Sequence, residues 1–388
     1  MKNRVVLKLV FFLVIIVSVA NAQDQLAAAK TGGKWGFIDK SGKFIIEAKY
    51  DKVLPFSEGL AAANIGYYFD AKNADACRTG KWGYIDRQGK WVIEPLFEVA
   101  ESFNESLAKV NIGAGYRDYR GVTLMGGKWG FLNKDGSWFI EPNDTLYGQF
   151  SEGICSFKVP RGSKWGYIDN KNKTIVQPIY WSTGDFKQGM APVMRDDYTF
   201  IYINSVGKQV FNSNFKKAFS FSQDRGFVKE TSGLAQFISP TGEFVFKVEN
   251  LKQDDNLSPE FSDGLVKLPV ETGSGIRIGY ASKNGEWIVK PIYELGDNFH
   301  EGLALVFSDR FYYFINQEGK KVFQLLDKIA EDPNTKVIYK GIPNPNIGMF
   351  SKGLCRVKMV DQWGFIDKSG SFAIKPQFEE VLDFTAID

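Results

Sequence analysis

Residues of the types that usually carry out catalysis are scarce in this sequence. His300 is the sole histidine, so a Ser-His-Asp or Cys-His arrangement has to use it, and no nucleophile signature such as G-x-S-x-G accompanies it. His300 occupies the serine position of a repeated F-S-E-G-L segment, where we expect a solvated turn residue. A metal site made of several histidines is excluded by the same count. The sequence therefore predicts no catalytic residue, no metal and no cofactor.

Acidic residues are abundant, and their positions in the repeat indicate a structural role in turns, not a role in catalysis or calcium binding. Repeated Asp-x-x-Gly segments such as Asp39–Gly42 lack the D-x-[DN]-x-[DN]-G ligand series of calcium loops. A pair of carboxylates that hydrolyses a glycosidic bond remains an alternative, because propeller folds host such enzymes. Most of the acids recur at turn positions, however, where a structural role accounts for them.

The net charge of the chain is too small to attract a highly charged partner electrostatically. The chain has 48 Lys plus Arg and 45 Asp plus Glu, and three of the cations lie within the first 22 residues. Without that segment the charges cancel, so we expect neither nucleic acid nor an anionic membrane as partner.

The first 22 residues have the features of a secretory signal peptide. Lys2, Arg4 and Lys8 form a basic start, Leu9–Val19 is apolar, and Ala20–Ala22 supplies a small-x-small cleavage site. No later stretch is apolar for 18 residues. We therefore expect a soluble, exported product from about Gln23, located in the periplasm or outside the cell and not inserted in a membrane.

The three cysteines do not resemble a disulfide framework. Cys155 and Cys355 occupy the same place in a repeated pattern, where other copies have alanine, so we expect small buried strand residues. Cys77 lies in a polar insertion.

These residues are carried by a repeat that spans the chain from residue 23 to 388. Copies begin at Trp35, Trp82, Trp129, Trp165 and Trp363, and four degenerate copies have Phe200, Ala235, Ile278 and Tyr312 at the tryptophan position. The nine copies have a mean period of about 41 residues. The chain is therefore one array, not a set of unrelated domains.

Each copy reads as about four short antiparallel strands. The W-G-F-I-D segment alternates as a strand does, and a second strand such as Phe44–Ile46 follows after a turn of the type Asp39–Gly42. A proline then ends the pairing in most copies. A third extended piece such as Tyr50–Phe56 leads to F-S-E-G-L, which turns the chain into a fourth strand, Leu60–Ala63.

The motif W-G-[FY]-[IL]-[DN]-x-x-G, followed by P-x-[YF] and F-S-E-G-L, resembles the WG-repeat (KWG-repeat) family of bacterial proteins. The resemblance covers almost the whole chain after the signal segment. It implies an architecture and a binding role, not a particular reaction.

Four strands per repeat match a blade of a β-propeller. The start of the array supplies the last three strands of a unit, and the end, Pro376–Phe384, supplies a first strand without a partner. The two ends can therefore complete one blade and close a propeller-like ring. An open β-superhelix of the same units is the alternative.

The Trp-Gly pairs are best interpreted as packing residues. An indole at the start of the hairpin can pack against the next unit, and the glycine lets backbone or ring approach closely. The predicted structural residues are Trp35, Gly36, Trp82, Gly83, Trp129, Gly130, Trp165, Gly166, Trp363 and Gly364.

Three insertions interrupt the repeat, at residues 64–80, 111–127 and about 325–348. The first two fall at the same junction and are rich in Tyr and Arg, which often anchor interfaces. We therefore predict a non-enzymatic interaction scaffold that binds a protein or glycan partner through these insertions. The alternatives are a glycan-active hydrolase and a structural envelope spacer without ligand. The predicted binding residues are Tyr67, Tyr68, Phe69, Tyr116, Arg117, Tyr119 and Arg120.

Overall fold

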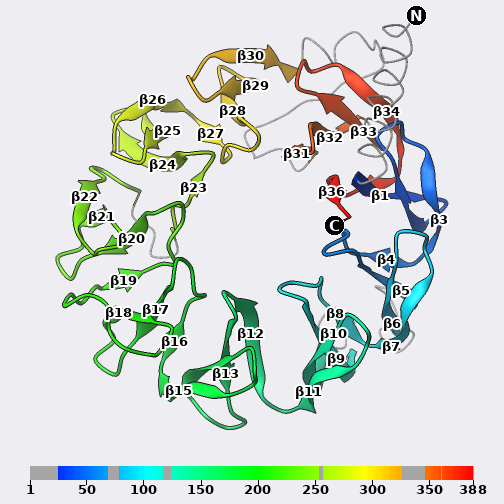
Figure 1. The fold of residues 1–388 in the computed structure, drawn as a ribbon. Helices are drawn as coiled ribbons and strands as arrows, with labels where there is room; N and C mark the ends of the chain where they lie inside the picture. Colours follow the sequence, from blue (N-terminus) through cyan, green and yellow to red (C-terminus); the bar gives the residue numbers. More distant parts are fainter. Residues whose placement is uncertain are drawn as a thin grey trace, which may run out of the picture. The chain divides into compact units, whose positions relative to one another are not determined.

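A computed structural model describes residues 25–68, 78–116, 124–252, 257–325, 346–359 and 361–387. Within these ranges the chain forms nine antiparallel sheets (Figure 1). The signal segment 1–22, Cys77 and most of the third insertion lie outside them. The chain divides into two compact units, residues 1–139 with 346–388 (unit 1) and residues 140–345 (unit 2).

Unit 1 contains four sheets, and the boundary between the units falls inside β11. One has the order β3-β2-β1-β35, with β36 also paired to β1. The others have the orders β4 to β7, β8 to β11 and β31 to β34. The strands are β1 (Gln25–Thr31), β2 (Lys34–Ile38), β3 (Phe44–Tyr50), β4 (Lys52–Val53), β5 (Ala61–Tyr68), β6 (Arg78–Ile85), β7 (Trp91–Phe97), β8 (Val99–Ala100), β9 (Leu107–Tyr116), β10 (Leu124–Asn133), β11 (Trp138–Asn143), β31 (Ile347–Ser351), β32 (Leu354–Met359), β33 (Gln362–Asp367), β34 (Phe372–Phe378), β35 (Glu380–Val381) and β36 (Thr385–Ala386).

Unit 2 contains five sheets in chain order, of which the one formed by β16, β17 and β18 has three strands. The strands are β12 (Leu146–Ser151), β13 (Ile154–Lys158), β14 (Trp165–Asp169), β15 (Thr174–Tyr180), β16 (Ser182–Thr183), β17 (Met190–Met194), β18 (Phe200–Asn204), β19 (Lys217–Ala218), β20 (Gly226–Lys229), β21 (Ala235–Ile238), β22 (Phe244–Lys247), β23 (Phe261–Ser262), β24 (Leu265–Thr272), β25 (Gly275–Ser282), β26 (Trp287–Tyr293), β27 (Leu295–Gly296), β28 (Leu303–Ser308), β29 (Phe311–Asn316) and β30 (Lys321–Gln324).

The predicted turn after W-G-F-I-D is confirmed in all nine copies. In the first copy the Gly42 amide donates to the Asp39 carbonyl, and the Asp39 carboxylate accepts the amides of Ser41 and Lys43. The fourth turn residue has a positive φ in every copy, 83° at Gly42 and 58° at Asn172. Glycine adopts this conformation without strain and asparagine tolerates it, which explains the composition of the turn.

The glycine of each Trp-Gly pair permits a β-bulge. Pairing of β2 with β3 shifts register between Trp35 and Phe37. A Cβ on Gly36 would lie 2.3 Å from the carbonyl oxygen of Ile46, closer than real Cβ atoms come. Gly83, Gly166 and Gly364 face a backbone carbonyl in the same way, at 2.3 to 2.5 Å. The expected close backbone approach is therefore confirmed at these glycines.

The two ends of the described chain share one sheet, as the sequence predicts for a closed propeller. β1 pairs antiparallel with β35, through Ala29 with Val381 and Lys30 with Glu380. β1 also pairs with β36 (Figure 1, blue beside red). An open superhelix does not predict this shared sheet. The fold class is thus all-β, with β-propeller blades.

Neighbouring sheets within each unit are joined by a repeated aromatic contact. The Phe37 ring of W-G-F packs edge-on against Phe56 of F-S-E-G in the next sheet, with centroids 4.7 Å apart. Tyr84 with Phe103, Tyr167 with Phe186 and Tyr280 with Phe299 repeat the arrangement at 4.8 to 5.1 Å. Such pairs add about 0.5–1.5 kcal/mol beyond the area that they bury.

Two kinds of side-chain hydrogen bond cross the same seams. Serine hydroxyls of F-S-E-G donate to the carbonyl of the phenylalanine in the next copy, and the five cases span 2.5 to 2.8 Å. The Tyr84 hydroxyl donates to the Glu101 carbonyl at 2.8 Å, and Tyr167 and Tyr280 have equivalent bonds. Burial raises the pKa of these three tyrosines, so each phenol keeps its proton as a donor.

The tryptophans are less buried than a core role requires, with one exception. Trp35 is 9% exposed and belongs to a cluster with Val53 and Ile85 of the next sheet. The other four are half-buried; Trp129, for example, has the Lys109 ammonium 5.2 Å from its ring centroid. Packing at a seam is therefore confirmed fully at Trp35 and in part at Trp82 and Trp363, which contact neighbouring clusters.

Two further expectations can be compared with the structure. Within the extended piece Tyr50–Phe56, Tyr50 ends β3 and only Lys52–Val53 forms a new strand, because the chain then leaves the sheet to place Phe56 in the seam. Cys155 and Cys355 are buried strand residues of β13 and β32, as predicted. In the part of the chain that the structure describes, no helix is long and apolar enough to cross a membrane.

Candidate functional site

The first two insertions extend the second and third strands of two successive sheets in unit 1. Pairing of β5 with β6 continues to Tyr68 and Arg78, and pairing of β9 with β10 continues to Tyr116 and Leu124. Each pair of long antiparallel strands is treated as one element: we call β5 with β6 hairpin A and β9 with β10 hairpin B.

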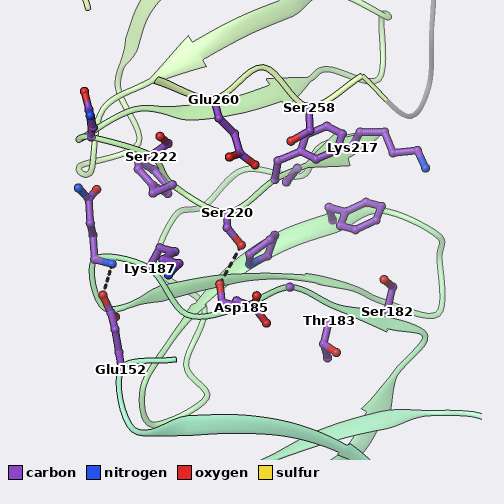
Figure 2. Close-up of a pocket in the computed structure, with 18 residues that line it drawn as sticks. Glu152, Ser182, Thr183, Asp185, Lys187, Lys217, Ser220, Ser222, Ser258 and Glu260 are labelled. Atoms are coloured by element: carbon purple, nitrogen blue, oxygen red, sulfur yellow. Dashed lines mark hydrogen bonds between the residues drawn. The ribbon is translucent and has the colours of Figure 1, made fainter. Parts of the chain in front are cut away.

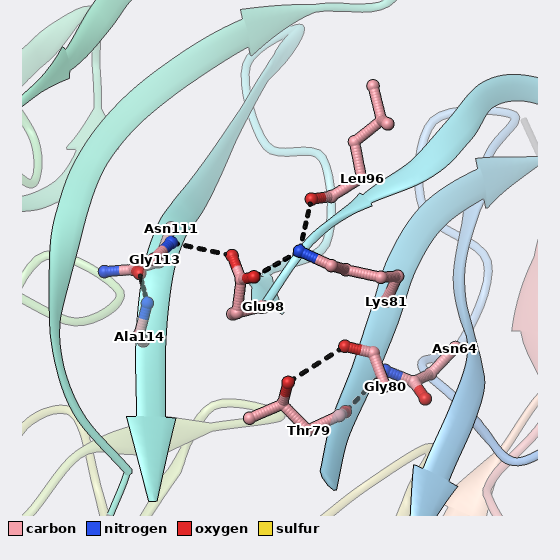
Figure 3. Close-up of polar contacts among 9 residues, drawn as sticks. All are labelled: Asn64, Thr79, Gly80, Lys81, Leu96, Glu98, Asn111, Gly113 and Ala114. Carbon is pink, nitrogen blue, oxygen red and sulfur yellow. Dashed lines mark hydrogen bonds and ion pairs between the residues drawn. The ribbon is translucent and has the colours of Figure 1, made fainter.

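A buried asparagine lies at the base of each hairpin (Figure 3). Asn64 and Asn111 are both fully buried. The Asn64 side-chain amide donates to the Thr79 carbonyl at 3.1 Å, and the side-chain oxygen of Asn111 accepts the Ala114 amide at 3.2 Å. A Cβ on Gly80 would lie 2.3 Å from the Asn64 oxygen, so glycine is required there.

A carboxylate fixes each hairpin from outside. The Gly66 amide of hairpin A donates to Asp51 at 2.6 Å, and the Gly113 amide of hairpin B donates to Glu98 at 2.7 Å. Asp51 also pairs with Lys34, and Glu98 with Lys81, the lysine before Trp-Gly in each case. These acids lie outside the turn positions, yet both carboxylates are held by structural partners.

The structure places two of the predicted binding side chains on hairpin A. The Lys52 ammonium lies 3.5 Å from the centroid of the Tyr67 ring, which holds the ring over β4. Tyr68 is 52% exposed, and Ile65 and Ile112 are exposed on the two hairpins. Tyr116 is described only by its backbone, and Phe69, Arg117, Tyr119 and Arg120 lie outside the described residues. Of the seven predicted binding residues, the described side chains are therefore those of Tyr67 and Tyr68.

A second candidate, which the sequence did not reveal, is a cleft of about 790 Å³ in unit 2 (Figure 2). Its walls come from the first strands β16 and β19 of two neighbouring sheets, from the turns that follow Phe186 and Phe221, and from the segment before β23. We call it the unit 2 cleft. It is lined by Glu152, Ser182, Thr183, Gly184, Asp185, Lys187, Gln188, Pro192, Phe200, Lys217, Ala218, Phe219, Ser220, Phe221, Ser222, Gln223, Ser258 and Glu260.

Gly184 lies in the wall of this cleft and packs closely against its neighbours. A Cβ on Gly184 would lie 2.7 Å from the Pro192 ring and 3.2 Å from the Ser220 hydroxyl. Gly148 and Gly348 occupy the same position before Phe150 and Phe350, so this glycine does not distinguish the cleft in the sequence.

Parts of the cleft wall are fixed by internal hydrogen bonds. The Ser220 hydroxyl donates to the Asp185 carbonyl at 2.8 Å, and the Gln188 and Gly189 amides donate to the two Glu152 oxygens at 2.6 and 2.7 Å. Glu152 is thus a structural acceptor, because both of its oxygens have backbone partners.

His300 is half-buried and lies near a perturbed acid. Burial raises the pKa of the Asp297 carboxyl, and the charges of Lys267 and His300 oppose that shift. Asp297 borders a cavity of about 90 Å³ lined by Ile278, Leu305 and Phe307 among others. Within the described residues, no three His, Cys, Asp or Glu side chains form a group that can hold a metal ion.

The repeat matches the model of a known protein family. The model of the WG-containing repeat matches residues 35–69, 82–116, 129–159, 165–198, 278–309 and 363–386. This chain belongs to the WG-repeat family. The six matched copies of this WG-repeat protein are the five with Trp-Gly and the one with Ile278-Gly279, so the family model follows the bulge glycine.

Structural comparison shows the fold alone. A crystal structure of the eukaryotic initiation factor is similar to this chain with a TM-score of 0.59 and 11% identity, covering 94% of this chain and 98% of that one. BamB from Moraxella catarrhalis gives a TM-score of 0.39 at 13% identity, over 76% of this chain and 89% of that one. The computationally designed Ika8 protein gives 0.42 at 10% identity, over 82% and 93%. A comparison with curated protein sequences found no match.

Proposed function

We propose that this WG-repeat protein is an exported, non-enzymatic binding scaffold that recognises a protein or glycan partner through hairpins A and B. The observation that carries the proposal is the exposure of Ile65, Tyr68 and Ile112 on two hairpins with fixed bases. A partner that meets such a surface loses little entropy in ordering it.

The matched construction of the two hairpins supports a shared role. Both have the sequence Asn-Ile-Gly, a buried asparagine and an acid that accepts the glycine amide. The two hairpins thus have one construction at their bases, which supports a common role for them. The same observation argues against the spacer alternative.

The hydrolase alternative receives less support. It requires two carboxylates, one as acid and one as base or nucleophile, in a common cleft. Asp51, Glu98 and Glu152 lie outside the Asp-x-x-Gly turns, but each accepts backbone amides within the fold. Asp185 and Glu260 are the two other carboxylates that line one cleft, so the alternative rests on them. A panel of glycosidic substrates tests this alternative directly, and turnover would replace the binding proposal by the enzymatic one.

The binding surface can be tested with a triple variant, Ile65→Ser, Tyr68→Ser and Ile112→Ser. These exposed side chains contribute little to the core, so we expect an unchanged Tm and loss of the partner recovered by cross-linking and affinity capture. The control is Tyr198→Ser, which removes a tyrosine that is 68% exposed in unit 2. Equal recovery by the triple variant and the control would discard the hairpin assignment. Absence of any saturable partner for the unaltered protein would favour the spacer.

Export is tested separately. We expect the mature protein to begin near Gln23, and N-terminal sequencing of the protein from the periplasm and from the medium would show both the cleavage site and the location. A product retained in the cytoplasm with Met1 would contradict the proposal.

A further inference from the structure

The unit 2 cleft combines a suitable size with chemistry that the propeller scaffold does not need. Its volume of about 790 Å³ lies within the range of about 300–1,000 Å³ that is typical of small-ligand sites. It lies within one unit of the chain, between the sheets of β16 and β19, with Glu152 from the preceding repeat and Ser258 and Glu260 from the following one. We propose that this cleft binds a neutral oligosaccharide, at a site separate from hairpins A and B.

Side-chain hydroxyls are the first argument. Ser182, Thr183 and Ser258 line the cleft in addition to the serines that bond across the seams. Among the described residues, the hydroxyls of Ser182 and Ser258 have no hydrogen-bond partner. A hydroxyl both donates and accepts, as does each hydroxyl of a sugar, so this lining matches a polyhydroxylated ligand.

The charges in the cleft are the second argument. Asp185 and Glu260 supply acceptors, and Lys187 and Lys217 supply donors. In the view of Figure 2, Ser258, Glu260 and Lys217 lie on one side and Ser182, Thr183 and Asp185 on the other. With Glu152, whose oxygens accept backbone amides, the lining has three acids and two cations, so it carries no excess of positive charge. A phosphate or another polyanion would gain no net attraction, whereas a neutral ligand can bond to both signs.

The aromatic walls are the third argument. Phe200 and Phe219 line the cleft and are half-buried, so part of each ring faces it. Lys217 lies 5.8 Å from the centroid of the Phe200 ring, which places a donor beside an apolar face. A sugar ring has an apolar C–H face and a hydroxylated rim, and this pairing of ring and polar groups fits both.

The test uses the full-length mature protein and calorimetry against neutral oligosaccharides of two to six units, including glucose and N-acetylglucosamine oligomers. Acidic oligosaccharides and an unbiased peptide panel are the comparison ligands. We expect saturable binding of at least one neutral oligosaccharide, and weaker or no binding of the acidic ones. Preference for a peptide or for an anionic ligand would overturn the inference, as would failure of every neutral oligosaccharide to bind.

Two variants locate the site. Glu260→Gln with Ser258→Ala changes side chains that are partly or fully exposed, so folding should be retained, and we expect Kd to rise about tenfold or more. Glu286→Gln is the matched control, because this exposed glutamate of unit 2 lies outside the cleft lining, and we expect its Kd to be unchanged. Equal affinities for both variants would place the oligosaccharide elsewhere and overturn the assignment.

The hairpin variant separates this site from the proposed partner surface. The triple variant at residues 65, 68 and 112 should bind the oligosaccharide with unchanged Kd. Loss of sugar binding in that variant would show that the hairpins, and not the cleft, hold the sugar. The partner capture described above has its own readout, so either proposal can fail without the other.

Discussion

The hydroxyl of Ser57 donates a hydrogen bond of 2.7 Å to the backbone carbonyl of Phe103, at the same place in the next repeat. Ser57 follows Phe56, whose ring packs in the seam on its other side. One turn of each repeat therefore contacts both of its neighbours. The F-S-E-G-L motif is in this sense a connector between sheets as well as a turn.

Removal of this hydroxyl should weaken the seam. We expect Ser57→Ala to lower the free energy of unfolding by about 0.5–1.5 kcal/mol, because the half-buried carbonyl of Phe103 loses its donor. Urea unfolding of the two proteins measures the difference. Ser205→Ala, at an exposed turn, is the control and should have no effect. Equal stability of all three proteins would show that the bond contributes nothing.

The bulge glycine should be intolerant of a methyl group. Gly36→Ala places a Cβ 2.3 Å from the Ile46 carbonyl oxygen, so the backbone of β2 or β3 has to move. We expect a loss of about 1–3 kcal/mol in the free energy of unfolding. Gly273→Ala is the matched control, because no atom lies within 4 Å of its added Cβ and its φ is not positive. A variant at Gly36 as stable as that control would refute the steric explanation.

The tryptophans of the Trp-Gly pairs differ in burial, so they should contribute unequally to stability. We expect Trp35→Ala to lower the free energy of unfolding by about 3–5 kcal/mol, since this side chain is buried among residues of two sheets. Trp165→Ala should lower it by less, because that side chain is half-buried. Urea denaturation of both variants gives the comparison, and a larger loss at Trp165 would contradict the assigned packing.

Asp297 should make stability depend on pH. Its pKa is raised in the folded state, so the folded protein holds the proton more tightly than the unfolded chain does. The free energy of unfolding therefore falls as pH rises from the unfolded pKa, about 3.9, through the folded pKa. Asp297→Asn removes this penalty and should be more stable than the parent at pH 7, with the difference vanishing towards pH 3. Urea unfolding at several pH values measures the effect, and lower stability of the variant at pH 7 would contradict it.

Deletion of residues 376–388 tests the shared sheet. β35 and β36 would be lost, and β1 would then have an unpaired edge. We expect a large fall in Tm together with faster hydrogen exchange throughout unit 1. Faster exchange confined to the last remaining strand would indicate that the ends do not support the rest of the unit.

Much of the fold follows from short-range rules that the sequence displays. The Asp39–Gly42 turn, the small residue after Trp35 and the missing strand at the chain start each depend on a few neighbouring residues. Spacing alone was enough to predict them. The degree of tryptophan burial was overestimated, because it depends on side chains from the adjacent sheet, such as the lysine beside Trp129.

The candidate sites were less accessible to sequence reasoning. Insertions rich in tyrosine marked hairpin A, but the acids that fix the hairpins lie in a different part of the repeat, at Asp51 and Glu98. The unit 2 cleft joins residues from Glu152 to Glu260 that only the packing of successive sheets brings together. No motif or spacing in the sequence marks such a set of residues.

The pairing of Lys30 with Glu380 has a consequence for biosynthesis. These residues are 350 positions apart, so β1 is among the first strands to leave the ribosome and has to wait for one of the last. The edge of β1 that pairs with β35 stays open until Glu380 has left the ribosome, and only then can the two strands pair. Until that moment the open edge is a surface on which a strand of another chain can pair, so early pairing errors concentrate there.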